Sequence, residues 1–261
     1  MSERQSLLAA VTADPEDDAV RLVYADWLDE NGEAPRAEFI RTQIGREKLG
    51  KKSKKRDGME ARERELLALH AEEWLRPVPK WARPQKDDMI ADEIEWFGFR
   101  RGFLQGVIFP GVKTFLRDAP KLFALEPITH TYLGGGEGLP ELAAKSPEFM
   151  RLVGMRFGHY STGDAGVIEL SKLPVMPNLR QLWLYKNEIG DAGLKALAKW
   201  PGLATVEDLE LGFNDFQAEG IKALIASPYV TKLKRLDLSD SLIAAKTKKA
   251  LKERFGKVVD V

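Results

Sequence analysis

Cysteine is absent from the 261-residue sequence, which excludes disulfide bonds, thiolate metal sites and a cysteine nucleophile. There is no surplus charge either, because 40 lysines and arginines match 40 aspartates and glutamates, so net charge attracts neither nucleic acid nor a membrane surface. No apolar run approaches the roughly 18 residues of a membrane span, and no basic-then-apolar leader opens the chain. These absences predict a cytoplasmic protein.

A nine-residue pattern recurs at a fixed spacing in the second half of the chain. Residues 179–187 fit Leu-x-x-Leu-x-Leu-x-x-Asn, and the frame returns 27 residues later at 206–214 and again at 233–241. Weaker copies begin at Leu152 and Ile128. A period of about 20 to 29 residues with this pattern is typical of leucine-rich repeats.

Each such repeat forms a strand, a turn and a helix, and neighbouring repeats bury each other's apolar faces. We therefore predict an α/β fold for residues 127–261: a leucine-rich-repeat solenoid with a parallel sheet, outer helices, about five repeats and a C-terminal edge strand. Asn187 and Asn214 follow their strands, where a buried amide can bond the backbone of the turn. Gly193 and Gly220 are expected where each helix begins close to its neighbour.

Alternate strand residues point away from the leucines and form columns on the concave face. Aromatic residues and arginine in such positions are typical of interface hot spots. We therefore predict that a protein partner binds this face, through Tyr132, Arg156, Trp183, Tyr185, Asp208, Glu210 and Asp237. In the alternative, Trp183 and Tyr185 pack on neighbouring side chains or on the N-terminal domain. Glycines beside them favour a shallow pocket, and hence binding.

Two carboxylates of this face, Glu210 and Asp237, fall on adjacent strands about 5 Å apart. A close carboxylate pair also fits a hydrolase of the glycosidase type. Arg156 and Arg235 are expected near enough to neutralise both, so we interpret the pair as surface charge and expect no enzyme activity.

Metal and cofactor sites are not indicated by the sequence. Asp26, Asp29 and Glu30 share one helix, but they offer fewer oxygen ligands than calcium or magnesium takes. The three histidines are far apart, whereas a zinc site needs three or four convergent donors. The glycine-rich stretch 134–138 lacks the lysine and the spacing of a phosphate-binding loop. We expect no metal and no cofactor.

The first half of the chain is predicted to be rich in helices. Ser2 and Gln5 form a capping box for the first helix, and Asp17 or Asp18 caps the second, which stops at Asn31-Gly32. Pro35 suits the start of a third helix. A fourth is expected from about Met59 to Trp74.

After the prolines at 77, 79 and 84 the sequence becomes rich in aromatic and β-branched residues, which predicts a β-hairpin. Its strands are expected at 93–99 and 103–109, joined through Arg100-Arg101-Gly102. Residues 113–125 are expected to form one or two short helical turns before the first repeat.

Several motifs of this half resemble a bacterial repeat-companion domain. They are Arg21 to Gly32, with Tyr-Ala-Asp-Trp-Leu at 24–28, then 36–43, Arg101-Gly102-Phe103, and 126–128. The resemblance covers roughly residues 1 to 130 and implies a domain that precedes leucine-rich repeats, with no catalytic residue to carry over. The later half is similar to repeats of the ribonuclease-inhibitor type, with 187–198 as the best copy.

The run from Arg46 to Arg56 holds seven basic residues against one acidic residue. Such a cluster can neutralise phosphates, so binding of nucleic acid or an anionic surface is an alternative function. No aromatic residue is interleaved for base stacking, and a solvated loop is the alternative interpretation.

Together these patterns predict two domains: an α-rich domain with a hairpin at 1–126 and the repeat domain at 127–261. The function that they indicate is non-enzymatic recognition of a protein.

Overall fold

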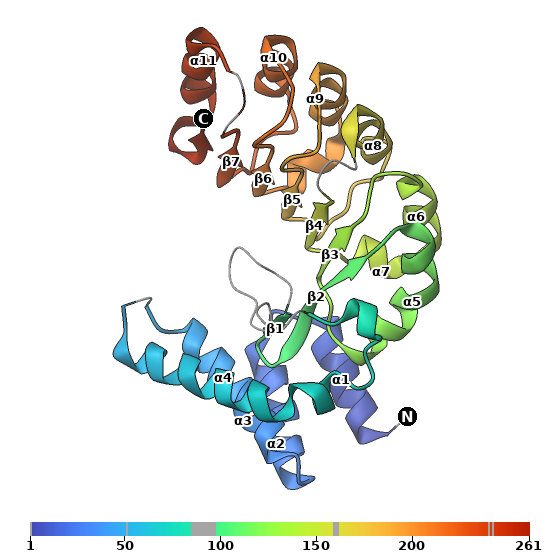
Figure 1. Ribbon diagram of the computed structural model, residues 1–261, viewed down its shortest axis with the longest axis vertical. Coiled ribbons are helices and arrows are strands. Elements are labelled where there is room, and N and C mark those ends of the chain that lie inside the picture. Colours follow the sequence, from blue (N-terminus) through green and yellow to red (C-terminus); the bar gives the residue numbers. More distant parts are fainter. Residues whose placement is uncertain (1, 51, 85–97, 159–161, 240, 242) are drawn as a thin grey trace. The chain divides into compact units, whose positions relative to one another are not determined.

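The chain forms two compact units. The structure is a computed structural model that describes residues 2–50, 52–84, 98–158, 162–239, 241 and 243–261 (Figure 1). Residues 1–107 and 120–129 form the first unit, and residues 108–119 and 130–261 form the second. The division therefore passes through strand β2 (Phe103–Phe109) and helix α5 (Val112–Leu125).

The described residues of the first unit form four α-helices, a short 3-10 helix and a hairpin, together with the end of α5. The predicted capping box is present: the Ser2 hydroxyl accepts from the Gln5 N–H, and the Gln5 side chain accepts from the Ser2 N–H. Asp17 caps the second helix, and Gly32 follows its end with φ +81°. The elements before β2 are α1 (Glu3–Ala13), α2 (Asp18–Glu30), α3 (Ala34–Glu47), α4 (Lys54–Trp74), η1 (Lys80–Ala82) and β1 (Gly98–Arg100).

The core of this unit lies between α1, α2, α3 and β2. Helical spacing gives each helix one apolar side, and burying these sides together is the main favourable contribution to folding. The buried residues of the cluster are Val11, Tyr24, Ala25, Leu28, Ala37, Ile40, Ile44 and Phe103.

The hairpin is confirmed for the described residues. Strand β1 pairs antiparallel with β2, and Arg101-Gly102 form the turn with φ +49° and +85°. A side chain at position 102 would place its Cβ 2.1 Å from Ile40 Cγ1, so close packing requires glycine there. The predicted strand residues 93–97 lie outside the described residues.

Two helix predictions are wrong in extent. Helix α4 begins at Lys54 rather than Met59, so residues 54–56 of the basic run are helical and not loop. Arg56 pairs with Glu60 at i,i+4, which supports the first turns. Residues 112–125 form one helix rather than short turns, because Phe115, Ala119 and Leu122 recur at helical spacing and are buried.

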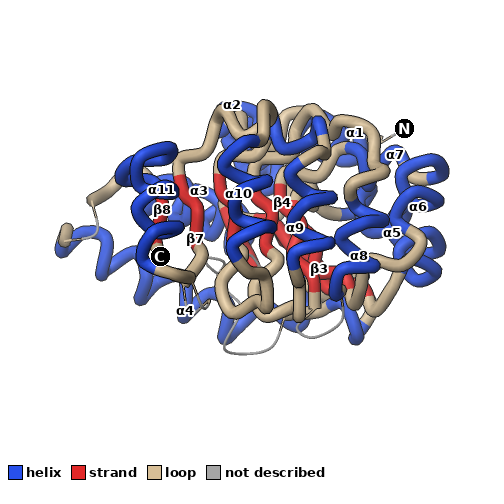
Figure 2. Tube along the Cα trace, turned by 90° about the horizontal axis from the view of Figure 1, so that it is seen from above, coloured by secondary structure: helices blue, strands red, loops and turns tan. Residues whose placement is uncertain are grey.

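A parallel sheet with helices on one side forms the second unit (Figures 1 and 2). The strands are β3 (His130–Leu133), β4 (Gly154–Phe157), β5 (Gln181–Trp183), β6 (Asp208–Glu210), β7 (Arg235–Asp237) and β8 (Val259–Asp260). The helices that follow α5 are α6 (Leu139–Lys145), α7 (Pro147–Met150), α8 (Gly163–Leu170), α9 (Asp191–Ala198), η3 (Pro201–Thr205), α10 (Ala218–Ala226), α11 (Ala245–Phe255) and η4 (Gly256–Val258).

Side-chain hydrogen bonds join successive repeats at two levels. At the strand ends, Asn214 Oδ1 accepts from the N–H groups of Asn187 and Ile189 at 3.0 and 3.1 Å, and its Nδ2 donates to Leu184 O at 2.8 Å. The predicted role of a buried amide in the turn is therefore confirmed for Asn214.

At the helix starts, an aspartate of one repeat caps the helix of the next. Asp164 Oδ1 accepts from Gly190 and Gly193 at 2.8 and 2.7 Å, and Asp191 Oδ1 accepts from Gln217 and Gly220 at 2.8 and 2.7 Å. A Cβ at Gly193 would lie 2.5 Å from Asp164 Oδ1, and one at Gly220 would lie 2.6 Å from Asp191 Oδ1. The glycines thus allow the close approach predicted from their spacing.

Candidate functional site

The side of the sheet away from the helices presents a row of polar and aromatic side chains. We call it the strand face and define it by alternate residues of β3 to β7. The predicted central column is in register on adjacent strands: Tyr132, Arg156, Trp183, Glu210 and Asp237. Strand β8 extends it, because Asp260 pairs with Asp237. The leucines between these positions, such as Leu182 and Leu209, are fully buried on the other side.

Trp183 is covered in the structure, with 2% of its surface exposed. The guanidinium of Arg156 lies over its ring, 5.4 Å from the ring centroid, where the negative face of the indole attracts a cation. This burial matches the alternative in which Trp183 packs on its neighbours. Arg156 itself is half-buried.

An aromatic contact lies where β5 and β6 end. The ring centroids of Tyr185 and Phe213 are 5.1 Å apart, and Lys186 Nζ lies 5.8 Å from the Phe213 ring. Phe213 is 42% exposed. Sequence reasoning missed it, although Lys186 and Phe213 are 27 residues apart, occupy the same repeat position and share a positive φ of 59° and 55°.

Arg235 brings three of the predicted carboxylates together. Its Nη1 lies 3.2 Å from Asp208 and 2.9 Å from Glu210, and its Nη2 lies 3.2 Å from Asp237. The three carboxylate side chains are 13% to 21% exposed, whereas Arg235 is 48% exposed. One cation therefore serves three acids in this cluster, which we call the Arg235 cluster.

Burial changes the acidity of this cluster. It raises the pKa of Asp208, against the opposing effects of Arg235 and of the Trp183 indole N–H. Burial also raises the pKa of Glu210, again opposed by Arg235. Desolvation penalises an ionised carboxylate, so it outweighs one shared guanidinium here.

Neighbouring side chains occupy the space over the glycines Gly154 and Gly212 of the strand face. His130 reaches over Gly154 to Gln181, with 2.9 Å between His130 Nε2 and Gln181 Oε1. A Cβ at Gly154 would lie 2.2 Å from the imidazole of His130. Gly212 is likewise close to Ser239, whose Oγ would be 3.0 Å from a Cβ there. The shallow pocket expected above these glycines is therefore filled at Gly154.

Glu210 and Asp237 lie in register on adjacent strands, as the hydrolase alternative requires. Both carboxylates are bound by Arg235, which holds them in a charge-paired arrangement. In the described part of the chain, no group of three or more His, Asp and Glu side chains is arranged to hold a metal ion. Asp26 and Asp29 of α2 instead bind Arg41 at 2.6 and 2.5 Å.

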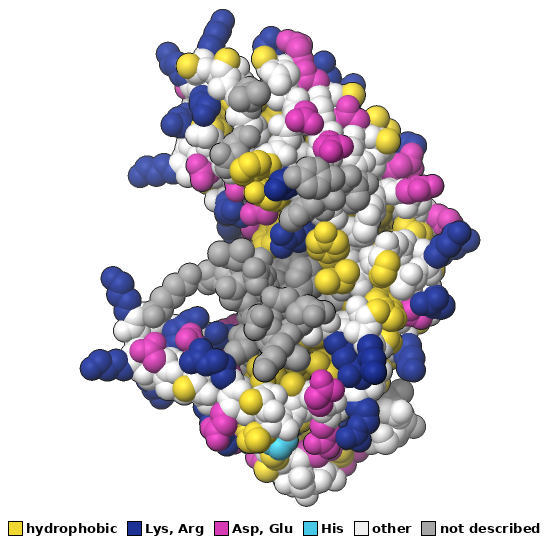
Figure 3. All heavy atoms as spheres, in the orientation of Figure 1, with side chains coloured by type: hydrophobic (Ala, Val, Ile, Leu, Met, Phe, Trp, Pro, Cys, Tyr) yellow, Lys and Arg dark blue, Asp and Glu magenta, His cyan; other side chains and the backbone are white. Residues whose placement is uncertain are grey.

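Three side chains of the basic run at 46–56 form ion pairs with acidic residues of the first unit. Arg46 pairs with the buried Glu63 at 2.7 Å, Lys48 with Asp18 at 3.3 Å, and Arg56 with Glu60 at 3.0 Å. In Figure 3, basic and acidic side chains are interspersed over the visible face, which is unlike a single basic stripe. The run therefore carries fewer uncommitted cations than its composition predicted.

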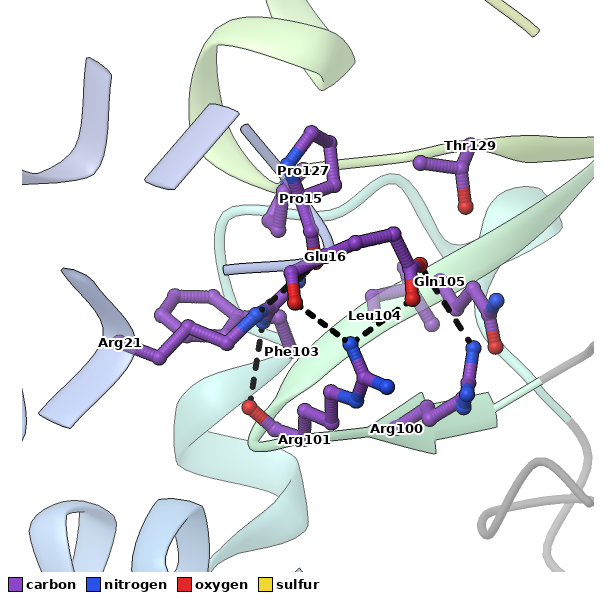
Figure 4. A pocket seen from close by; sticks show the side chains of 10 residues that line it. All are labelled: Pro15, Glu16, Arg21, Arg100, Arg101, Phe103, Leu104, Gln105, Pro127 and Thr129. Carbon is purple, nitrogen blue, oxygen red and sulfur yellow. Dashed lines mark hydrogen bonds and ion pairs between the residues drawn. The ribbon is translucent and has the colours of Figure 1, made fainter. Parts of the chain in front are cut away.

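The motifs that resemble a companion domain meet in the first unit. Figure 4 shows a small pocket there, in which Arg21 donates to the carbonyls of Pro15 at 2.6 Å and Arg101 at 3.2 Å. Arg101 binds Glu16 and Glu47, each at 2.8 Å. Burial lowers the pKa of Arg21 to about 10. These groups bind each other, so we interpret them as structural.

Two further motif residues also bind the hairpin. Gln43 is fully buried, accepts from the Gly102 N–H at 2.7 Å and donates to Phe99 O at 3.1 Å. Glu126 accepts from the Leu104 N–H at 2.8 Å. The polar residues of the motifs thus hold α2, α3 and the hairpin together.

None of the helices among the described residues is both long and apolar enough to cross a membrane. Comparison with curated proteins gave no match. A family model described as Leucine Rich repeat matches residues 175–198 and 202–224, which contain β5 with α9 and β6 with most of α10. The two best copies of the 27-residue pattern are therefore leucine-rich repeats within an α/β fold.

Proposed function

We propose that this chain is a non-enzymatic recognition module that binds a protein partner through the strand face. Leucine-rich repeats commonly mediate protein–protein interaction, because their stacked units present an extended binding surface. From the sequence motifs we also propose a repeat-companion domain in the first unit, repeats of the ribonuclease-inhibitor type in the second unit, and a cytoplasmic location.

The Arg235 cluster is the observation that carries this proposal. Three carboxylates share one half-exposed arginine, so ionisation leaves a surplus of negative charge on the strand face. Asp260 adds another carboxylate beside Asp237. A complementary partner surface would present lysine or arginine, and charge of opposite sign steers association and selects the partner.

Two aromatic residues just beyond the ends of β5 and β6 supply contact area next to the strand face. Phe213 and Tyr185 lie against each other at the ends of β5 and β6, and Phe213 is exposed. Exposed aromatic side chains at interfaces contribute large buried area with few rotatable bonds. We propose that basic partner residues bind the Arg235 cluster while an apolar group contacts Phe213.

The test is a pull-down from lysate of the source organism with three proteins. These are wild type, a face variant with Glu210→Gln, Asp237→Asn and Phe213→Ser, and a control with Glu219→Gln and Glu253→Gln on the helix side. Circular dichroism and thermal unfolding first establish that all three are folded.

A protein retained by wild type and by the control, but lost from the face variant, supports the proposal and identifies the partner. Its retention should weaken as salt rises, because exposed charge pairs are screened. Retention of the same proteins by all three would show that the strand face does not bind the partner.

A further inference from the structure

Arg36 is a buried arginine held between aromatic rings. It lies on α3, is 8% exposed, and its guanidinium centre is 4.6 Å from the Trp74 ring centroid, 4.9 Å from Phe99 and 5.7 Å from Phe103. These contacts fix the guanidinium through its faces, where cation–π attraction acts. Cation–π contacts do not use the N–H groups of a guanidinium as hydrogen-bond donors to oxygen, so these groups still need acceptors.

Those N–H groups are poorly satisfied. The nearest carboxylate, Glu126 Oε1, is 3.7 Å from Nη2, longer than a hydrogen bond, and the other oxygen of Glu126 accepts from the Leu104 N–H. Nη1 is buried and has no hydrogen-bond partner among the described residues. Arg21, buried to a similar degree, donates to two carbonyls. Buried donors are nearly always bonded, so Arg36 needs an explanation.

An open hollow of about 490 Å³ lies beside this arginine in the first unit. That volume lies within the range of small-molecule sites, about 300–1,000 Å³. Its walls include Arg36, Arg4, Arg76, His70 and Trp74, and His70 stacks on Trp74 with ring centroids 5.5 Å apart. The hollow therefore combines cations with a flat aromatic wall.

Two of the three arginines are not committed to a carboxylate by hydrogen bonds. Arg4 binds both oxygens of Glu33, at 2.7 and 3.2 Å. Arg76 is exposed, and its guanidinium has no ion pair within the described ranges. Glu33 and Glu73 also line the hollow, and Glu126 lies beside Arg36, so three glutamates balance the three arginines.

We propose that this hollow binds the phosphate group of a small molecule. Arg76 has no ion pair and Arg36 Nη1 has no hydrogen bond among the described residues, so both offer N–H groups to a ligand. A phosphate monoester presents three acceptor oxygens to such donors, whereas a carboxylate presents two. Guanidinium also presents a planar fork that suits phosphate oxygens. The ring of His70, which stacks on Trp74 and lines the hollow, is the aromatic surface for an apolar group attached to the phosphate. This site is separate from the strand face, so its test is independent of the proposed function.

Isothermal titration calorimetry of the full chain tests this site, with inorganic phosphate and phenyl phosphate as probes and acetate at equal ionic strength for comparison. The variants are Arg76→Gln, which changes an exposed residue, and Arg36→Lys, which keeps the charge but loses the fork. Arg64→Gln is the matched control, because Arg64 is exposed on α4 and does not line the hollow.

We expect saturable one-to-one binding of both phosphates, tighter than that of acetate, and a loss of about tenfold in affinity in Arg76→Gln. Arg64→Gln should bind as wild type does. Tighter binding of phenyl phosphate than of inorganic phosphate would assign an ester as the ligand class, and equal binding would assign the phosphate group alone.

The absence of saturable binding for both probes overturns the proposal. So does phosphate binding that Arg76→Gln leaves unchanged, since the anion would then be bound elsewhere. Arg36→Lys adds a second check if it is folded, because a lysine cannot replace the fork and affinity should fall. Arg76→Gln decides the question by itself if Arg36→Lys does not fold.

Discussion

Single side chains determine the charge of the strand face. Arg235 is the shared partner of Asp208, Glu210 and Asp237. Burial pushes the pKa values of Asp208 and Glu210 up, and Arg235 pulls them down. The pKa values of Asp208 and Glu210 therefore reflect burial first and the opposing charge of Arg235 second.

Arg235→Gln should raise the pKa of Asp208 and Glu210 further, because it removes the opposing charge and leaves burial. Carbon-detected NMR titration of the side-chain carboxyl groups measures both midpoints. Lys234→Gln is the control, since Lys234 pairs with Glu207 instead. Midpoints that stay in place in Arg235→Gln would contradict the assigned cause.

The raised pKa values of Asp208 and Glu210 also determine the direction in which folding stability changes with pH. A carboxyl group whose pKa is raised by folding binds its proton more tightly in the folded state, so its contribution to stability falls as pH rises. The loss begins near the ordinary values of 3.8 for Asp208 and 4.5 for Glu210 and is complete above their raised pKa values. Urea unfolding at several pH values should show a steeper loss in Arg235→Gln than in wild type.

Gly102→Ala should destabilise the first unit strongly, because φ is +85° and the new Cβ would meet Ile40 at 2.1 Å. Strain and overpacking together cost roughly 3 kcal/mol. Gly32→Ala is the matched control: φ is +81°, but no atom lies within 4 Å of the new Cβ, so only the backbone strain of about 1 kcal/mol remains. Equal losses in thermal or urea unfolding would show that contact with Ile40 is unimportant.

At the scale of secondary-structure elements, side-chain hydrogen bonds join neighbouring repeats in addition to the backbone hydrogen bonds of the sheet. Helix α9 is bound at its start by Asp164 of α8, and α10 by Asp191 of α9. Trp200 Nε1 also donates to Leu173 O of the preceding repeat at 2.8 Å. These bonds span 26 to 29 residues and fix the spacing between helices.

Asp191→Ala should lower the free energy of unfolding by about 1–2 kcal/mol, since it leaves two N–H groups at the start of α10 without their acceptor. Asp191→Asn keeps an oxygen acceptor and should cost less. Urea denaturation followed by circular dichroism compares the two. Similar losses in both would mean that charge, not the hydrogen bonds, is responsible.

The sequence predicted the strands well because the 27-residue period and the leucine alternation determine the register. Leu182, Leu209 and Leu236 pair as expected. Burial of Trp183 was one of two outcomes that the sequence left open, because leucine alternation gives its side of the sheet but not the positions of neighbours such as Arg156. The aspartate caps were missed, although Gly-Asp-Ala-Gly stands at both 163–166 and 190–193 and could have revealed them.

At the scale of the whole molecule, the two units are interleaved along the chain. Residues 108–119 belong to the second unit, although they precede residues 120–129 of the first. The predicted boundary at 126 would separate 108–119 from the repeats. Phe115 is fully buried there and packs on Phe149, with 5.8 Å between ring centroids.

A fragment that begins at residue 108 should therefore be more stable than one that begins at 127. The shorter fragment lacks Phe109 and Phe115 and exposes the surface of Phe149 that Phe115 covers. Burial of two such rings contributes about 3–6 kcal/mol. Urea midpoints of both fragments measure the difference, and equal midpoints would support the boundary at 126.

The last helix, α11, lacks the aspartate cap that the preceding repeats provide for α9 and α10. Position 218 is alanine where the preceding helices carry Asp164 and Asp191, and the start of α11 has no side-chain cap. Local opening therefore needs less free energy at α11 than at α9, so its amide hydrogens exchange with solvent sooner. Helix α11 connects β7, which carries Arg235, to β8. We therefore expect a partner bound at Arg235 to slow amide exchange in α11, so that this exchange rate would report whether the partner is bound.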